Sequence, residues 1–327
     1  MPSAYTHNII AEEALPDIGG VSDSERAMYL FGAQGGDPMF FFRFVKYRSV
    51  APGKLLHRMN IYGGLCAMCA YVRSHPEAMA YASGYISHYA ADTVFHPFVY
   101  CLADRAGGTR MDRNMTHTRV ERELDTYFVR KKRGVYMHSY ALPYAEEDID
   151  EGIVAGVLGA ALGTIGISAD VGYVKKAISG YFRFLRGTFD AHGLRRRVSE
   201  AIGRAGIKPF GLLGALFSRE DYSEETVNES RREWYNVMDG SVRRDSASEL
   251  LSRAVRRTVE LIGIFRMCCE KDMPLPVELF SDNLLTGLPE LYGDIDKVYG
   301  DETDWHERVR EFIAQGSGKA DIKKKGK

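Results

Sequence analysis

The sequence predicts an all-α fold. Apolar residues recur mainly at the three- and four-residue spacing of helices, and the alternation of apolar and polar residues that marks strands is rare. Between residues 250 and 265 the apolar positions form a stripe that suits one face of a helix packed on a core. The stripe comprises Leu250, Leu251, Ala254, Val255, Thr258, Leu261, Ile262 and Phe265.

Local signals divide the chain into helical segments. In the first half, helices are expected over residues 5–15, 24–34, 53–73, 76–95 and 113–130. We expect Pro16 to end the first and Pro97 to end the fourth, and Ser22 or Ser24 to cap the second. In the second half, a glycine-rich stretch over residues 152–167 is followed by helical stretches expected near residues 171–186 and 223–270.

The length of 327 residues suffices for one large domain or two modest ones. The polar, acidic stretch over residues 143–150 is a candidate boundary. We therefore expect a first helical domain over residues 1–142 and a helical extension of unknown role over residues 143–318. The polar residues 319–327 are expected to form a disordered tail.

The composition is that of an ordinary soluble globular protein, with 45% hydrophobic and 27% charged residues. A net charge of −1 gives no general attraction for a polyanion, so nucleic-acid binding is disfavoured and would need a local basic patch. The first seven residues contain neither a basic nor an apolar region, so we do not expect a signal peptide. The longest apolar run, residues 153–167, has about 15 residues, whereas a transmembrane helix needs roughly 20. We expect a cytoplasmic protein, with contact to a membrane surface as an open alternative.

Two apolar features have a packing interpretation. The glycine-rich residues 152–167 favour close helix packing, with a membrane-contacting segment as the alternative.

The five cysteines are an odd number in apolar helical stretches, so reduced and buried thiols are expected. Cys66 and Cys69 have the CxxC spacing but follow no βαβ pattern, which favours a structural pair over a redox centre.

The motif that carries chemistry is His88-Tyr-Ala-Ala-Asp92-Thr-Val-Phe-His96. On a helix, residues four apart lie on one face, with about 5–6 Å between their Cβ atoms. His88, Asp92 and His96 would therefore form a column. Imidazole plus carboxylate is the ligand chemistry of zinc sites that keep an open position. Asp92, in the middle, could bridge two ions with its two oxygens.

A second pair, His117 and Glu121, has the same spacing on another predicted helix, and helical bundles hold metals with such pairs on facing helices. His7, Asp37 and His57 are further candidates. An isolated pair is more often a contact on a helix surface, but two pairs with three further candidates favour a metal site. The motifs of zincin proteases, P-loop NTPases and serine hydrolases with a nucleophile elbow do not occur.

The order of these residues resembles the zinc-dependent phospholipase C family, together with the single-strand-specific nucleases that share its fold and its trinuclear zinc site. The stretches Ala33-Gln-Gly-Gly-Asp37, His88-Tyr-Ala-Ala-Asp92 and His96-Pro97 are similar to motifs of that family. The resemblance covers roughly residues 2–130. It implies a multi-helix phospholipase C-like domain, whereas the helical C-terminal extension lies outside the resemblance.

The resemblance implies two or three zinc ions. The first would be held by Asp37, His57, His88 and Asp92, the second by His96, His117 and Glu121, and the third by His7 and the bridging Asp92. In the family, an N-terminal tryptophan chelates the third ion with its amino nitrogen and carbonyl oxygen. Here, removal of Met1 would expose Pro2, five positions before His7, and we expect Pro2 to take that place.

The resemblance also implies the hydrolysis of a phospholipid by zinc-activated water, which releases diacylglycerol and a phosphorylated headgroup. Asp37 is the candidate for orienting or deprotonating that water. Phe40, Phe41 and Phe42 follow closely and would wall a substrate pocket, although a core role is more common for such a run. Two alternatives stay open: a nuclease of the same fold, and a non-catalytic helical protein that binds zinc or lipid.

Overall fold

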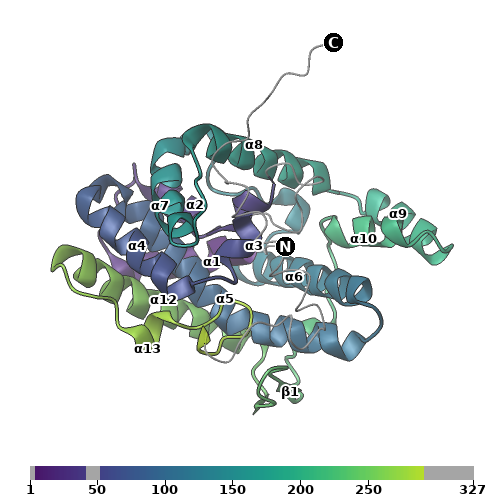
Figure 1. Ribbon diagram of the computed structural model, residues 1–327. Helices are drawn as coiled ribbons and strands as arrows, with labels where there is room; N and C mark the ends of the chain where they lie inside the picture. Colours follow the sequence, from purple (N-terminus) through teal and green to yellow (C-terminus); the bar gives the residue numbers. More distant parts are fainter. Residues whose placement is uncertain (1–3, 42–51, 291–327) are drawn as a thin grey trace, which may run out of the picture.

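The computed structural model describes residues 4–41 and 52–290 (Figure 1). Up to residue 139 its helices are α1 (Ala4–Ile18), α2 (Arg26–Gly32), η1 (Asp37–Phe40), α3 (Pro52–Leu56), α4 (Ile61–Ser74), η3 (Pro76–Ala78), α5 (Met79–Ala106), α6 (Arg110–Arg133) and η4 (Met137–Ser139). They are followed by η5 (Glu146–Asp148), α7 (Glu151–Gly163), α8 (Val171–Thr188), α9 (Leu194–Arg204), α10 (Lys208–Leu216), α11 (Glu224–Val227), α12 (Ala247–Glu270) and α13 (Val277–Phe280). The described strands are β1 (Trp234–Tyr235) and β2 (Val242–Arg243), so the predicted all-α fold is confirmed.

Helix α5 is the central element of the fold. It contacts α1, α2, α6 and α12, which lie around it (Figure 1). Every residue of α5 from Ala80 to Val99 is buried. A helix that is buried on all of its faces belongs to the interior of a protein. The polar side chains that α5 carries are therefore enclosed by the surrounding helices.

Two glycines allow α2 to approach α5 closely. A Cβ atom on Gly84 would lie 2.0 Å from the carbonyl oxygen of Tyr29, and one on Gly32 would lie 2.2 Å from that of Tyr81. Both distances are far below van der Waals contact, so the backbones of the two helices touch at this point. The contact fixes the residues that follow α2 relative to α5.

Helix α12 packs against α5 with the predicted apolar stripe. All stripe residues are buried except Val255, which is half-buried. A capping box at Ser246 and Glu249 starts the helix, since each side chain accepts from the backbone N–H of the other residue. The helical C-terminal half thus shares a core with α5. The division of the chain at residue 142 stays a prediction.

The two prolines do not end their helices, contrary to our expectation. Pro16 lies inside α1, which continues to Ile18, and Pro97 lies inside α5, which continues to Ala106. A proline removes its own N–H from the helix ladder and its ring crowds the carbonyl four residues earlier, but burial of the rest of the helix outweighs both costs. The expected helix end at Pro97 was therefore wrong because the sequence does not show the packing around it.

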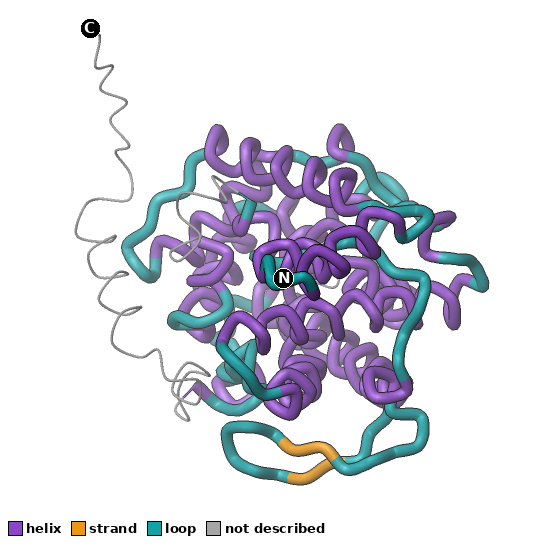
Figure 2. The backbone as a smooth tube through the Cα atoms, turned by 90° about the vertical axis from the view of Figure 1, so that its right-hand side faces the viewer, coloured by secondary structure: helices purple, strands orange, loops and turns teal. Residues whose placement is uncertain are grey.

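Three other predicted boundaries were wrong. The segment expected as one helix over residues 53–73 is broken between Leu56 and Ile61, where Asn60 has a left-handed backbone with φ 49°. The segment over residues 223–270 contains the β1–β2 hairpin, drawn in orange at the lower edge of the molecule (Figure 2). Helix α2 starts without a side-chain cap, because the Ser22 hydroxyl donates to Glu25 instead.

The glycine-rich residues 152–167 mostly form α7, which packs against α4. A Cβ atom on Gly156 would lie 2.0 Å from the hydroxyl oxygen of Tyr71, so glycine is needed for this close approach. The contact supports the packing interpretation of these glycines. None of the described helices combines the length and the apolar character needed to cross a membrane.

The described cysteines are all free thiols, and Cys66 is the only one that is not buried. Cys69 on α4 lies beside Cys269 on α12, with 3.1 Å between the two sulfur atoms. The partner of the Cys69 thiol thus lies on another helix, in the contact between α4 and α12.

The α2–α5 contact generates a stability prediction. We expect Gly84→Ala to lower the free energy of unfolding by about 1–3 kcal/mol, because the added methyl group has no space. Gly263→Ala is the matched control, since Gly263 also lies inside a long helix but a Cβ atom there would meet nothing within 4 Å. That control should stabilise the protein by about 0.5–1 kcal/mol. Equal urea-denaturation midpoints for both variants would contradict the close contact.

Candidate metal centre

Helix α5 places three predicted ligands on one face, because His88, Asp92 and His96 are spaced four residues apart. All three side chains are buried, with exposed fractions of 0%, 3% and 8%. His96 belongs to the same face because α5 continues past Pro97. The structure therefore brings the three residues together as the spacing predicts.

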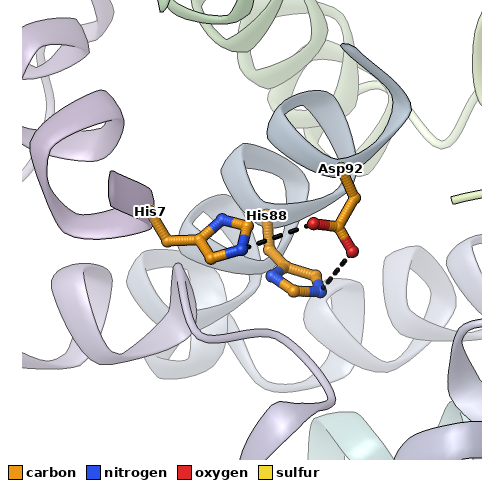
Figure 3. Close-up of side chains that lie close together, drawn as sticks. All are labelled: His7, His88 and Asp92. Carbon is orange, nitrogen blue, oxygen red and sulfur yellow. Dashed lines mark ion pairs between the residues drawn. The ribbon is translucent and has the colours of Figure 1, made fainter. Parts of the chain in front are cut away.

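Asp92 makes more of these contacts than any other residue, and Figure 3 shows its two carboxylate oxygens paired with His7 and His88. Its Oδ1 is 3.3 Å from Nε2 of His7 on α1. Its Oδ2 is 3.3 Å from Nε2 of His88, 3.4 Å from Nε2 of His57 and 3.6 Å from Nδ1 of His96. One carboxylate thus faces imidazole rings from α1, from α5 and from the segment after α3.

Asp37 and His57 complete this group. Asp37 is the first residue of η1, and its Oδ1 is 3.3 Å from Nε2 of His57. The same nitrogen is 3.1 Å from Nε2 of His88. His57 lies at the break after α3, and its Nδ1 donates to the carbonyl of Gly53 at 2.6 Å. That hydrogen bond directs Nε2 of His57 toward the carboxylates.

A second group lies between α5 and α6. Oε1 of Glu121 is 3.1 Å from Nε2 of His117 and 3.6 Å from Nε2 of His96. The other ring nitrogen of His96, Nδ1, donates to the carbonyl of Leu284 at 2.7 Å. His96 therefore presents Nε2 to Glu121 and His117. Since His96 also lies beside Asp92, it connects the two groups.

The glycines before Asp37 make room for the first group. Gly35 has φ +54°, and a Cβ atom on it would lie 2.1 Å from Cδ2 of His88. Position 35 therefore requires glycine, both because its φ is positive and because a side chain would collide with His88. A Cβ atom on Gly36 would lie 3.0 Å from that of Leu56, next to His57. The Gly-Gly-Asp sequence thus lets Asp37 approach two histidines.

Burial and charge set the protonation of the group. Burial opposes the negative charge of Asp92, but the surrounding rings, His88 and His96 foremost, hold its pKa well below the usual range. Burial also opposes the charge of His57, but Asp37 and Asp92 outweigh it and raise the pKa of His57 to about 10. For His88 burial prevails and lowers the pKa to about 4. An ionised Asp92 and a neutral His88 are in the states that metal ligands require.

The donor set fits a metal ion. Within the described part of the chain, four buried atoms of the first group lack a hydrogen-bond partner, namely Oδ2 of Asp37, Oδ2 of Asp92, Nδ1 of His7 and Nδ1 of His88. Buried polar atoms nearly always have partners, and an unpaired buried carboxylate oxygen is costly. A cation beside these two carboxylates would offset the cost of burying them.

Three sets of side chains bring one ligand atom each to within 4.8 Å of the others. They are His7, His88 and Asp92; Asp37, His57 and His88; and His96, His117 and Glu121. Imidazole and carboxylate in sets of three suit zinc with an open coordination position. The hydrogen bonds that His57 and His96 donate to backbone carbonyls are of the kind that orients metal-ligating histidines.

The aromatic residues predicted to wall a substrate pocket differ in burial and in their neighbours. The ring of Phe40 is half-buried, with its centre 5.6 Å from that of His57. Phe41 is buried, and its ring lies 4.6 Å from that of Phe184 on α8. Phe41 is therefore part of the core. Phe42 and Pro2 lie outside the described residues.

Sequence reasoning missed several supporting groups. Asp125 is buried and accepts from the backbone N–H and the hydroxyl of Thr6, which attaches the start of α1 to α6. Its position four residues after Glu121 was a usable signal. Gln34 donates to the carbonyl of Ala4 and so attaches the glycine segment to α1. The contacts of the Gly53 and Leu284 carbonyls could not be predicted from the sequence, because every residue has a backbone carbonyl.

Comparison with known proteins agrees with this geometry. Residues 6–159 match the family model described as zinc dependent phospholipase C. No curated protein and no solved structure matches the chain. The matched range contains all candidate ligands from His7 to Glu121 and confirms the resemblance.

The contact of Gly35 with His88 generates a prediction for metal binding. We expect Gly35→Ala to weaken zinc binding about 10- to 100-fold, because the methyl group would displace a ligand ring. Gly19→Ala is the matched control, since Gly19 has the same φ of +54° but a Cβ atom there would meet nothing within 4 Å. The measurement is a competition titration with a zinc chelator. If both variants hold zinc as the wild type does, Gly35 does not position His88.

Proposed function

Because residues 6–159 belong to the zinc-dependent phospholipase C family, we propose that this chain is a zinc-dependent phosphodiesterase. The reaction would cleave a phospholipid into diacylglycerol and a phosphorylated headgroup. The observation that carries the proposal is the convergence of eight ligand side chains in the interior. They are His7, Asp37, His57, His88, Asp92, His96, His117 and Glu121.

We assign two or three zinc ions to these ligands. The first would be held by Asp37, His57, His88 and Asp92, the second by His96, His117 and Glu121, and the third by His7 with Asp92 as a bridge. The distances from Asp92 to His7 on one oxygen and to His88 on the other support a bridging role. Pro2, which lies outside the described residues, would complete the third set through its imino nitrogen and carbonyl.

When bound, zinc would supply positive charge to the phosphate oxygens and lower the pKa of a water molecule to about 7. The side chains of the chain would orient the reactants. Oδ1 of Asp37 faces Nε2 of His57, whereas its Oδ2 has no hydrogen-bond partner in the described residues. That oxygen is available to accept a proton from the water that attacks phosphorus. Asp37 is therefore our candidate for the general base.

The substrate assignment follows from the family. Phe40, half-buried beside His57, is the described aromatic that we propose as part of the substrate wall. A phospholipid substrate also implies peripheral contact with a lipid surface. A nuclease could use the same ligands, but a net charge of −1 provides no general attraction for nucleic acid. A non-catalytic protein that binds zinc or lipid would hold fewer than two ions.

Metal content and activity test the proposal together. Elemental analysis of the protein with an authentic N-terminus should give two to three zinc ions per chain. Phosphatidylcholine vesicles should release diacylglycerol. His88→Ala should lose zinc and activity, because His88 belongs to two of the three ligand sets. His192→Ala, which changes an exposed histidine outside these sets, should retain both.

The alternatives give different results in the same experiment. Zinc at two or three ions per chain, with cleavage of single-stranded DNA and no release of diacylglycerol, would identify a nuclease. One zinc ion or none, unchanged by His88→Ala, would mean that the histidines are packing residues. The hydrolase proposal would then be wrong.

Asp37 has its own test. We expect Asp37→Asn to lower kcat about 10²- to 10⁴-fold with little change in KM, because the amide cannot accept the proton. Zinc content must be measured in parallel, since Asp37 is also a proposed ligand. Asp17→Asn, at an exposed position, is the matched control and should behave as the wild type. An unchanged kcat in a variant that retains its zinc would exclude Asp37 as the base.

A further inference from the structure

A second candidate site lies on another flank of α5. A cleft of about 590 Å³ is formed by α5, α12, the β1–β2 hairpin and residues 281–290. Its wall on α5 consists of Thr93 and Val94, which directly follow Asp92. Successive residues of a helix point in different directions, about 100° apart. The cleft is therefore separated from the candidate metal centre by the helix itself.

Arginine dominates the lining of this cleft. It contains Arg243, Arg253, Arg256 and Arg257, against the carboxylates of Asp245, Glu260 and Asp282. Two of these arginines have carboxylate partners, because Arg253 pairs with Asp245 and Arg257 pairs with Asp282. For Arg243 and Arg256, no ion pair occurs within the described part of the chain. The cleft thus keeps positive charge that its own carboxylates do not neutralise.

Neighbouring groups hold two of the guanidinium groups in place. Arg257 donates to Oδ2 of Asp282 at 2.6 Å, and its guanidinium carbon lies 6.0 Å from the centre of the Tyr89 ring. The guanidinium of Arg243 lies 5.6 Å from the ring of the buried Trp234. Side chains that are fixed in this way lose little further freedom when they bind a ligand. The planar fork of arginine matches phosphate oxygens in particular.

We propose that this cleft binds a phosphate-bearing anion. Its volume lies within the range of about 300–1,000 Å³ that is usual for small-molecule sites. Arg243 and Arg256 would supply the charge, and Arg257 would add donors from a fixed position. This site is independent of the proposed hydrolase activity, because none of its lining residues is a proposed zinc ligand.

The cleft lies next to the surroundings of the candidate metal centre. Residues 281–290 form a wall of the cleft through Asp282 and Gly287. The same segment carries Leu284, whose carbonyl accepts from Nδ1 of His96. The cleft and the candidate metal centre therefore share this segment. The ligand could be a free phosphate compound or the headgroup of an anionic lipid, since both present the same oxygens.

The test compares arginine variants of the full, zinc-loaded chain by isothermal titration with inorganic phosphate. Arg243→Gln and Arg256→Gln should each weaken binding about tenfold, the loss expected for one charge-assisted hydrogen bond. Arg244→Gln is the matched control, because Arg244 is the neighbour of Arg243, is exposed and lies outside the cleft. Any phosphate that binds at the zinc ions would contribute equally to the titrations of all variants. The difference between a variant and the wild type therefore reports binding in the cleft.

Vesicle binding distinguishes the two sources of phosphate. If phosphatidic acid vesicles bind in a way that requires Arg243 and Arg256, while inorganic phosphate does not bind, the ligand is a lipid headgroup. If inorganic phosphate binds and depends on both arginines, the ligand is a free phosphate compound. The proposal is overturned if neither probe responds to these substitutions, or if Arg244→Gln lowers binding equally.

Discussion

The negative charge of Asp92 in the interior of the protein is the constraint on which the other features depend. Removing a carboxylate from water is unfavourable by several kcal/mol unless cations or hydrogen-bond donors surround it. Four imidazole rings approach Asp92, and they come from three segments of the chain. This convergence requires a helix that is buried on all sides. It also requires a close approach of α2, which the glycines of α2 and α5 provide.

The C-terminal half contributes to the same constraint. Pro97 has no N–H for the carbonyl of Thr93, and that carbonyl lies against Gly287, where a Cβ atom would be only 2.3 Å away. Three residues earlier, the carbonyl oxygen of Leu284 accepts a hydrogen bond from Nδ1 of His96. The segment from Asp282 to Gly287 therefore covers the irregular point of α5 and orients a proposed ligand. The side chains of the candidate metal centre all come from the first 121 residues, but residues beyond 280 complete its surroundings.

Local patterns in the sequence predicted what depends on local geometry. The four-residue spacing placed His88, Asp92 and His96 on one face, and the apolar stripe placed α12 on the core. The prediction failed where distant packing decides the outcome. Pro97 is a helix breaker only when nothing else holds the helix, and the break before Asn60 has no strong local signal. The contacts made by backbone carbonyls could not be predicted at all.

The break in the predicted helix over residues 53–73 shows that such failures matter for function. In a continuous helix, the side chain of His57 would be fixed by the direction of that helix. In the structure His57 follows α3, and its Nδ1 bonds to the carbonyl of Gly53, so Nε2 reaches both Asp37 and His88. The same principle applies to His96, whose orientation depends on a distant carbonyl. Residue type alone thus identifies the donor atoms of this centre, whereas irregular backbone decides which nitrogen each histidine presents.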